Sequence, residues 1–108
     1  MNVHVPPRTP LEQCVALIWT EVLKLDNLGI DDNFFAVGGH SLKATQIISR
    51  VRDTFRVDLP LRALFEAPTV ADFTIKLKAK LAESGALEQV ERFVAETPRA
   101  QKTRPING

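Results

Sequence analysis

The sequence predicts a small all-α protein, and three observations carry that prediction. Apolar residues recur at three- and four-residue steps in several separate segments, which is the period of one helix face. No run alternates apolar and polar residues as a half-buried strand does. Thr, Pro and Gly stand at the ends of the periodic segments, where helices commonly start and stop. We therefore expect a small four-helix bundle, with three long helices and one short helix, and a long first loop.

Length, charge and cysteine content narrow the class of protein. The chain has 108 residues, which fits one small domain, and 44% of them are apolar, which is enough for a core. The formal net charge of +1 lacks the strongly basic signature of nucleic-acid binding, and no stretch suits a membrane span or a signal peptide. A single cysteine excludes an intramolecular disulfide and fits a reducing compartment. We expect a cytoplasmic domain that is monomeric in isolation, with no nucleic-acid or membrane partner.

The first helix is expected over residues 10–25, after an extended, Pro-rich linker over residues 1–8. Thr9 can cap the helix, and Pro10 suits its first position. Glu12 then completes a capping box, because its side chain can reach back to the free N–H of the cap.

One face of this first helix is apolar, with Trp19 at its margin. Cys14 lies on the apolar stripe, so we expect a buried small hydrophobe and not a reactive thiol. Glu12 lies off the stripe, among the polar positions. The stripe consists of Leu11, Cys14, Val15, Ile18, Val22 and Leu25.

Residues 26–40 are expected to form the long loop, because they hold three Gly and three Asp among scattered apolar residues. A loop of this length in a small domain is usually functional or is packed down by its own side chains. Ile30, Phe34, Phe35 and Val37 are the candidates for that packing.

The second helix is expected over residues 41–55, with one apolar face formed by Ala44, Ile47, Ile48, Val51 and Phe55. Pro60 and Pro68 then bracket residues 61–67 and leave room for only a short helix.

The last long helix is expected to open at a Thr69 cap, with Asp72 in its first turn, and to stop at Gly85. These bounds place the domain at residues 9–84. Residues 85–108 form a C-terminal extension, in which 86–94 could form another amphipathic stretch before a disordered tail. We expect the residues after Gly85 to be dispensable for folding.

The sharpest local feature is Gly38-Gly39-His40-Ser41, where the long loop meets the second helix. Glycines permit backbone shapes closed to other residues and let another molecule approach closely. A phosphate on the Ser41 hydroxyl would be stabilised by the free N–H groups and the dipole of the helix start. The alternative is that Ser41 is only the N-cap of this helix.

Catalysis by Ser41 fails the tests of role and position. The run from Gly39 to Lys43 is similar to a Gly-x-Ser-x-Gly nucleophile elbow in which Lys replaces the last glycine. The elbow needs a preceding strand and a later histidine, but no strand is evident, no histidine follows Ser41, and His4 lies in the linker. Two histidines and one cysteine at unrelated positions make no metal-ligand set. We expect neither catalytic nor metal-binding residues.

Leu42 is an exception to the apolar pattern, because it projects from the outer side of the second helix beside Ser41. With Thr45, it is a candidate contact for a partner. Lys43 and Arg50 flank that outer side and are expected to be solvated charges.

The run from Asp32 to Leu42, with the sequence DNFFAVGGHSL, closely resembles the signature of peptidyl carrier (thiolation) domains of nonribosomal peptide synthetases. The segments Ile18–Leu23 and Leu59–Val70 are similar to further helices of that family, so the resemblance covers roughly residues 9–81. In the wider carrier superfamily, fatty-acid and polyketide carriers usually have Asp before the serine and a more acidic second helix. His40 stands at that position here, which favours the peptidyl branch.

The resemblance implies a carrier-protein-like four-helix bundle without catalytic activity. It also implies that a phosphopantetheinyl transferase attaches a 4'-phosphopantetheine arm to Ser41, next to Gly38, Gly39 and His40. The arm would carry aminoacyl or peptidyl groups as thioesters to adenylation, condensation or thioesterase domains of a synthetase.

Two other functions remain open at this stage. The first is a free-standing helical protein-interaction module in which Ser41 is a helix cap only. The second is a nucleic-acid binder that uses Arg99, Lys102 and Arg104 of the tail, although the near-neutral charge argues against it.

Overall fold

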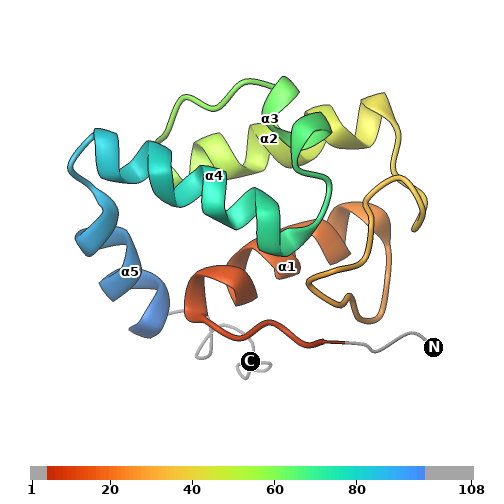
Figure 1. The fold of residues 1–108 in the computed structure, drawn as a ribbon, viewed down its shortest axis with the longest axis horizontal. Coiled ribbons are helices and arrows are strands. Elements are labelled where there is room, and N and C mark those ends of the chain that lie inside the picture. Colours follow the sequence, from red (N-terminus) through yellow and green to blue (C-terminus); the bar gives the residue numbers. More distant parts are fainter. Residues whose placement is uncertain (1–4, 97–108) are drawn as a thin grey trace, which may run out of the picture.

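The computed structural model describes residues 5–96, and within them it contains five helices and no strand (Figure 1). The all-α prediction is confirmed, and so are the three long helices and the short one. A fifth helix, which the sequence left open as an amphipathic stretch, follows them. The helices are α1 (Pro10–Leu23), α2 (Ser41–Phe55), α3 (Arg62–Glu66), α4 (Val70–Glu83) and α5 (Leu87–Glu96).

The core lies where α1, α2 and α4 meet, and Trp19 of α1 is at its centre. The Trp19 side chain is fully buried, and its ring centroid lies 5.7 Å from that of Phe34 in the long loop and 5.8 Å from that of Phe73 in α4. The predicted inner face of α2 is confirmed, because all five of its apolar residues are buried. Within residues 5–96 no helix is long and apolar enough to cross a membrane.

Helix α1 ends at Leu23, two residues before the predicted end. Lys24 adopts a left-handed conformation with φ of 61°, and its N–H bonds back to the carbonyl of Thr20, which closes the helix. At the other end, the predicted cap is present, because the N–H of Glu12 donates to Oγ1 of Thr9 at 3.1 Å.

The Glu12 side chain differs from the expectation, because it is buried and not solvated. Its carboxylate accepts hydrogen bonds from the main-chain N–H and the guanidinium of Arg8. This pairing supplies the partner that a buried carboxylate requires.

The long loop is packed down by three of the four predicted side chains. Ile30 and Phe34 are buried, and Val37 is partly buried against the same core. The fourth, Phe35, is 44% exposed, and its ring stacks on that of Phe65 in α3 with centroids 5.7 Å apart.

Helix α4 begins with the predicted Thr69 cap and is followed at Gly85 by a left-handed turn with φ of 78°. Beyond this turn, α5 folds back beside the start of α1 (Figure 1), and Val94 is 1% exposed within the main core. The domain boundary at residue 84 remains a prediction, and the burial of Val94 argues against it. The predicted tail after Pro98 lies outside the described residues.

Candidate functional site

Ser41 is the first residue of α2, and it is exposed at the junction with the long loop. His40, in extended conformation, is the N-cap residue, and its side chain makes no capping hydrogen bond. Helical bonding starts with the N–H of Ala44, which donates to the carbonyl of His40 at 2.8 Å. The interpretation of Ser41 as the helix cap is therefore wrong, because Ser41 already has its place inside the first turn.

The position of Ser41 suits an attached anion. The N–H groups of the first helical turn have no carbonyl partners within the helix, and the helix dipole adds partial positive charge there. The Ser41 main chain is fixed by the helix, since its carbonyl accepts a hydrogen bond from the Thr45 hydroxyl at 3.0 Å. The side-chain oxygen of Ser41 forms no hydrogen bond among the described residues, so it is free to react.

The two glycines before the site are required for different reasons. Gly38 has φ of 109°, a backbone conformation that residues with a side chain rarely adopt, although the space around it is open. Gly39 lies against the ring of Phe34, which leaves no room for a Cβ. Its N–H also donates to the Phe34 carbonyl at 2.9 Å. The glycine pair thus lets the chain pass over Phe34 and enter α2.

The turn that precedes the glycines is held by hydrogen bonds from its main-chain N–H groups to the Asn33 side chain and to the Pro68 carbonyl. The Asn33 side-chain oxygen accepts from the N–H groups of Phe35 and Ala36, at 2.8 and 3.2 Å. The N–H of Phe34 donates to the carbonyl of Pro68 at 2.6 Å, which ties the loop to the entry of α4. Because the Phe34 ring also contacts Trp19, the loop that leads to Ser41 is fixed to the core.

Exposed apolar side chains occur near Ser41 in the chain and on α3. Leu42 is 62% exposed, in agreement with its predicted outward direction, and Thr45 is exposed as well. The Phe35–Phe65 stack adds two rings that are about two-fifths exposed. Sequence reasoning missed this stack, because Phe65 belongs to a helix too short to show which of its faces is buried.

Of the two charges that the sequence predicted to be solvated, Arg50 is exposed as expected, whereas Lys43 is only half-exposed. The Lys43 amine donates to the carbonyl of Val22 at 3.2 Å, where it satisfies one of the last carbonyls of α1. Arg50 pairs with Glu21 of α1 at 2.8 Å. Two contacts therefore hold α2 against α1, although the second is exposed and contributes little to stability.

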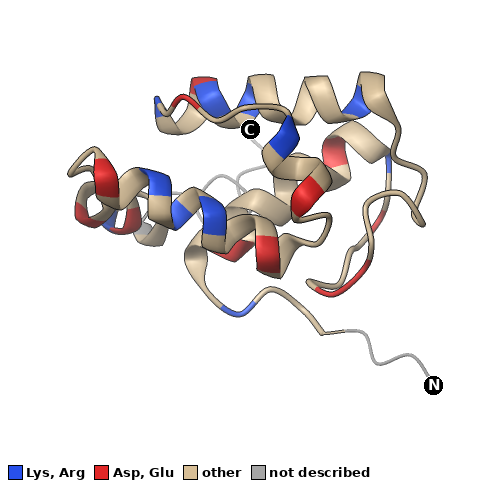
Figure 2. Cartoon of the chain, turned by 45° about the horizontal axis from the view of Figure 1, so that its top comes forward, with Lys and Arg blue, Asp and Glu red and all other residues tan. Residues whose placement is uncertain are grey.

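The distribution of charged side chains does not indicate a second binding site on the described surface. Figure 2 shows Lys and Arg along α2 and α4, with acidic residues between them and on the neighbouring elements. The described residues contain no cluster of three or more side chains suited to a metal ion.

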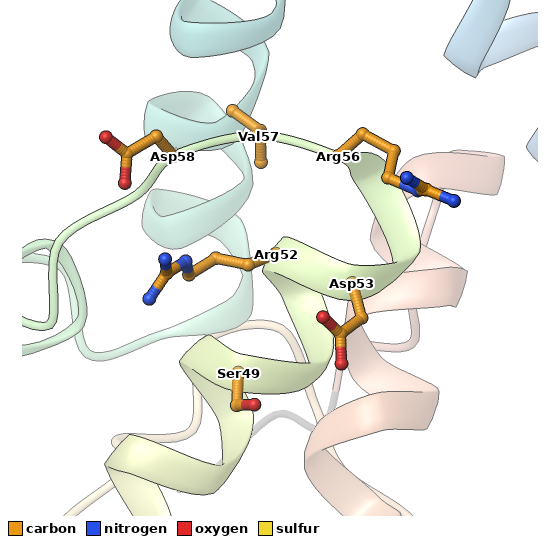
Figure 3. A pocket seen from close by; sticks show the side chains of 6 residues that line it. All are labelled: Ser49, Arg52, Asp53, Arg56, Val57 and Asp58. Carbon is orange, nitrogen blue, oxygen red and sulfur yellow. The ribbon is translucent and has the colours of Figure 1, made fainter.

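An open depression of about 530 Å³ lies at the far end of α2 from Ser41. Its two guanidinium groups, on Arg52 and Arg56, point in different directions (Figure 3), so they do not converge on one anion. The lining residues are Ser49, Arg52, Asp53, Arg56, Val57 and Asp58.

These features define a carrier domain: a small helical bundle that presents one exposed serine at a helix start, next to the exposed Leu42, and no side chain of residues 5–96 is hydrogen-bonded to that serine as an activating base. Within residues 5–96 the only histidine is His40, whose side chain makes no hydrogen bond at this helix start. The fold and site thus favour a serine that receives a group over a serine that performs catalysis.

Comparison with known proteins agrees with this class. Residues 15–77 match the family described as phosphopantetheine attachment site. Gramicidin S synthase 2 of Brevibacillus brevis is 48% identical over 81 residues, which are 75% of this chain and 2% of the synthase. Tyrocidine synthase 3 of Brevibacillus parabrevis is 51% identical over 99 residues, which are 92% of this chain and 1% of that synthase. The chain therefore spans only a very small part of either relative.

Two solved structures are similar in fold and sequence. One is a peptidyl carrier protein in complex with the phosphopantetheine transferase Sfp and coenzyme A, with a TM-score of 0.68 and 38% identity over 70% of this chain and 99% of that chain. The other is an active-site mutant of a peptidyl carrier protein, with a TM-score of 0.69 and 37% identity over 72% of this chain and 87% of that chain. The chain belongs to the phosphopantetheine attachment-site family, and within it this protein is a peptidyl carrier domain whose cofactor is a covalent 4'-phosphopantetheine.

Proposed function

We propose that Ser41 is the attachment point of the 4'-phosphopantetheine arm, and that the domain carries aminoacyl or peptidyl groups for a nonribosomal peptide synthetase. The observation that carries this proposal is the exposed Ser41 hydroxyl, which stands at the start of α2 without an internal hydrogen-bond partner. When bound, the arm supplies a terminal thiol on which the acyl group is held as a thioester.

The residues around Ser41 fit this group. Ser41 Oγ would bond to the phosphorus that bears the pantetheine in coenzyme A and lose its proton. The P–O bond of the diphosphate linkage would break at the same phosphorus, and adenosine 3',5'-bisphosphate would leave. The free N–H groups of the first turn of α2 favour the phosphodiester charge at this place. Gly38 and Gly39 carry no side chains that would obstruct the approach of a transferase. Within residues 5–96 the only histidine is His40, whose side chain makes no capping hydrogen bond at the start of α2, so we infer that the transferase supplies proton transfer and that the domain itself is not an enzyme.

Partner enzymes would dock on the surface beside the arm. Leu42 and Thr45 stand next to Ser41 on the outer side of α2, and both are exposed. A partner that covers Leu42 removes apolar area from water only in the complex, so this side chain can stabilise binding without stabilising the free domain. The proposed partners are a phosphopantetheinyl transferase and the adenylation, condensation or thioesterase domains of a synthetase. A cytoplasmic location would give the domain access to coenzyme A.

The attachment is tested by incubating the full chain with a phosphopantetheinyl transferase and coenzyme A and then measuring its intact mass. The wild-type chain should gain the mass of one phosphopantetheine group, and Ser41→Ala should gain none. Ser49→Ala is the matched control, because Ser49 is another exposed serine on the same helix. It should be modified as the wild type is. Modification of Ser41→Ala would place the arm on another residue and overturn the assignment of Ser41, and modification of no variant would favour the simple interaction module.

A further inference from the structure

Residues 5–8, directly ahead of α1, are bound to the domain and do not form a free linker. The N–H of Ile30 donates to the carbonyl of Val5 at 2.8 Å, and Val5 is partly buried against the core. Three residues later, the main-chain N–H of Arg8 donates to the Glu12 carboxylate at 2.8 Å. We refer to residues 5–8 as the strap.

The anchor of the strap is strong for a short surface segment. The guanidinium of Arg8 contacts both carboxylate oxygens of Glu12, at 3.2 Å from Nε and 2.8 Å from Nη2. The Glu12 side chain is 7% exposed, whereas that of Arg8 is 61% exposed. A carboxylate so deeply placed requires its donors, and release of Arg8 would leave it unpaired. Release of the strap is therefore unfavourable, because it would leave the buried Glu12 carboxylate without the Arg8 guanidinium.

Ile30 links the strap to the rest of the fold. Its N–H bonds to the strap, and its carbonyl accepts from the N–H of Ala71 in α4 at 3.0 Å. Four residues further along, Phe34 bonds to Pro68, and Phe34 in turn accepts from the N–H of Gly39. The loop that ends at the attachment serine is thus held between the strap on one side and the start of α4 on the other.

We propose that the strap positions the loop that presents Ser41, so that Val5 and Arg8 act as positioning residues for arm attachment. With the strap bound, the loop is held at Ile30 and at Phe34. With the strap released, Ile30 loses its bond to Val5, and the loop samples conformations in which the glycine pair and Ser41 are not presented. The transferase then meets a smaller competent fraction, which raises the apparent KM for the carrier in proportion. Only this last step rests on the proposed function.

The test compares Arg8→Ala with Lys80→Ala in the full chain. Lys80→Ala is the matched control, because it removes an exposed i,i+3 pair with Glu83 on α4, away from the strap. In Arg8→Ala, hydrogen exchange of the Ile30 amide should become faster by about threefold to tenfold, as expected when a main-chain hydrogen bond loses its support. Exchange of the Val51 amide in α2 should not change, and Lys80→Ala should behave as the wild type does.

Arm transfer is then measured well below the unfolding temperature of each variant. Arg8→Ala should raise KM for the carrier by about threefold to tenfold and leave kcat unchanged. Both variants keep the main-chain N–H that donates to Glu12, and Arg8→Lys also keeps one charged donor. Arg8→Lys should therefore recover part of both effects, and it replaces Arg8→Ala in the test if that variant folds poorly.

Unchanged hydrogen exchange of the Ile30 amide in Arg8→Ala would overturn the proposal that Arg8 holds the strap against the loop. Faster exchange with unchanged KM would overturn its role in positioning and leave a structural contact. If the wild-type chain accepted no arm at all, the proposed function would fail, whereas the exchange measurement would still decide whether the strap holds the loop.

Discussion

The ring of Phe34 lies against Gly39 on the side where any other residue would carry its Cβ. Phe34 cannot retreat, because it is fully buried and packs edge to face on Trp19 with centroids 5.7 Å apart. Gly38, one residue earlier, has open space around it but a φ of 109°. Packing against Phe34 therefore requires a glycine at position 39, and the backbone conformation requires one at position 38.

This difference between the glycines can be measured. Gly39→Ala should lower the free energy of unfolding by about 1–3 kcal/mol through overpacking, and Gly38→Ala by a similar amount, about 1–3 kcal/mol, through its backbone. Phe34→Leu, which replaces the ring with a smaller side chain, should relieve part of the Gly39→Ala effect but none of the Gly38→Ala effect. A double-mutant cycle from urea unfolding should give a coupling of about 0.5–3 kcal/mol for residues 34 and 39. Additive effects for that pair would contradict the packing argument.

Opposite faces of α2 predict opposite phenotypes for two of its aliphatic residues. Leu42 is 62% exposed, so Leu42→Ala should change stability by less than about 0.5 kcal/mol and slow arm attachment or loading. Ile48 is 5% exposed, so Ile48→Ala should destabilise the fold by about 2–5 kcal/mol, with ordinary attachment kinetics at temperatures where it remains folded. Thermal unfolding and attachment rates of both variants provide the check. Equal losses of stability would mean that Leu42 has a role in the core.

The faces of α2 could be predicted because a helix face depends only on a local period of side chains. Ile47 and Val51, one turn apart, must point the same way whatever surrounds them, and both are fully buried. The exposure of Leu42 follows from the same geometry. The start of the helix was harder, because a cap at Ser41 or at His40 depends on one backbone conformation that the local sequence does not fix.

Contacts between segments distant in the chain could not be predicted, because no local period encodes them. Lys43 reaches the Val22 carbonyl across 21 residues, and a surface position on its own helix gave no sign of this. Glu12 is buried because Arg8, outside the helix, pairs with it. At the site, the sequence identified the glycine motif, but the reason for Gly39 is the ring of Phe34 in the folded loop.

Cys14 should be an unreactive thiol at neutral pH. Burial, with a smaller effect of the Glu21 charge, raises the pKa of the Cys14 thiol to about 11. At pH 8, alkylation by iodoacetamide should be about two orders of magnitude slower than for a free cysteine, because so little thiolate is present. The same protein in urea is the control and should react at the ordinary rate. Rapid alkylation of the folded chain at pH 8 would contradict this prediction.

The raised thiol pKa of Cys14 also predicts how the free energy of unfolding changes at high pH. Between the ordinary thiol pKa of 9.0 and about 11, the unfolded thiol loses its proton while the folded thiol keeps it. The unfolded state then binds fewer protons, so stability falls as pH rises through this window. Cys14→Ala should lack that part of the fall. Denaturant unfolding at several pH values between 8 and 11, for both proteins, tests the difference.

Helix α5 should contribute to the stability of the domain, although the sequence alone indicates an extension beyond residue 84. Val94 is 1% exposed in the main core, and it lines a crevice of about 310 Å³ with Leu11 of α1. Truncation of a buried aliphatic side chain removes transfer free energy and leaves a cavity. Val94→Ala should therefore lower the free energy of unfolding by about 1–3 kcal/mol, or the midpoint by about 5–10 °C.

Phe93, the adjacent residue, is the matched control, because it is 55% exposed on the same helix. Phe93→Ala should change stability by less than about 0.5 kcal/mol. A chain that ends at Glu83 should still melt cooperatively and accept the arm, because the Trp19 cluster and Ser41 precede that point, but it should melt at a lower temperature than the full chain. A truncated chain as stable as the full chain would show that the domain ends at residue 84 and that α5 rests on it without effect.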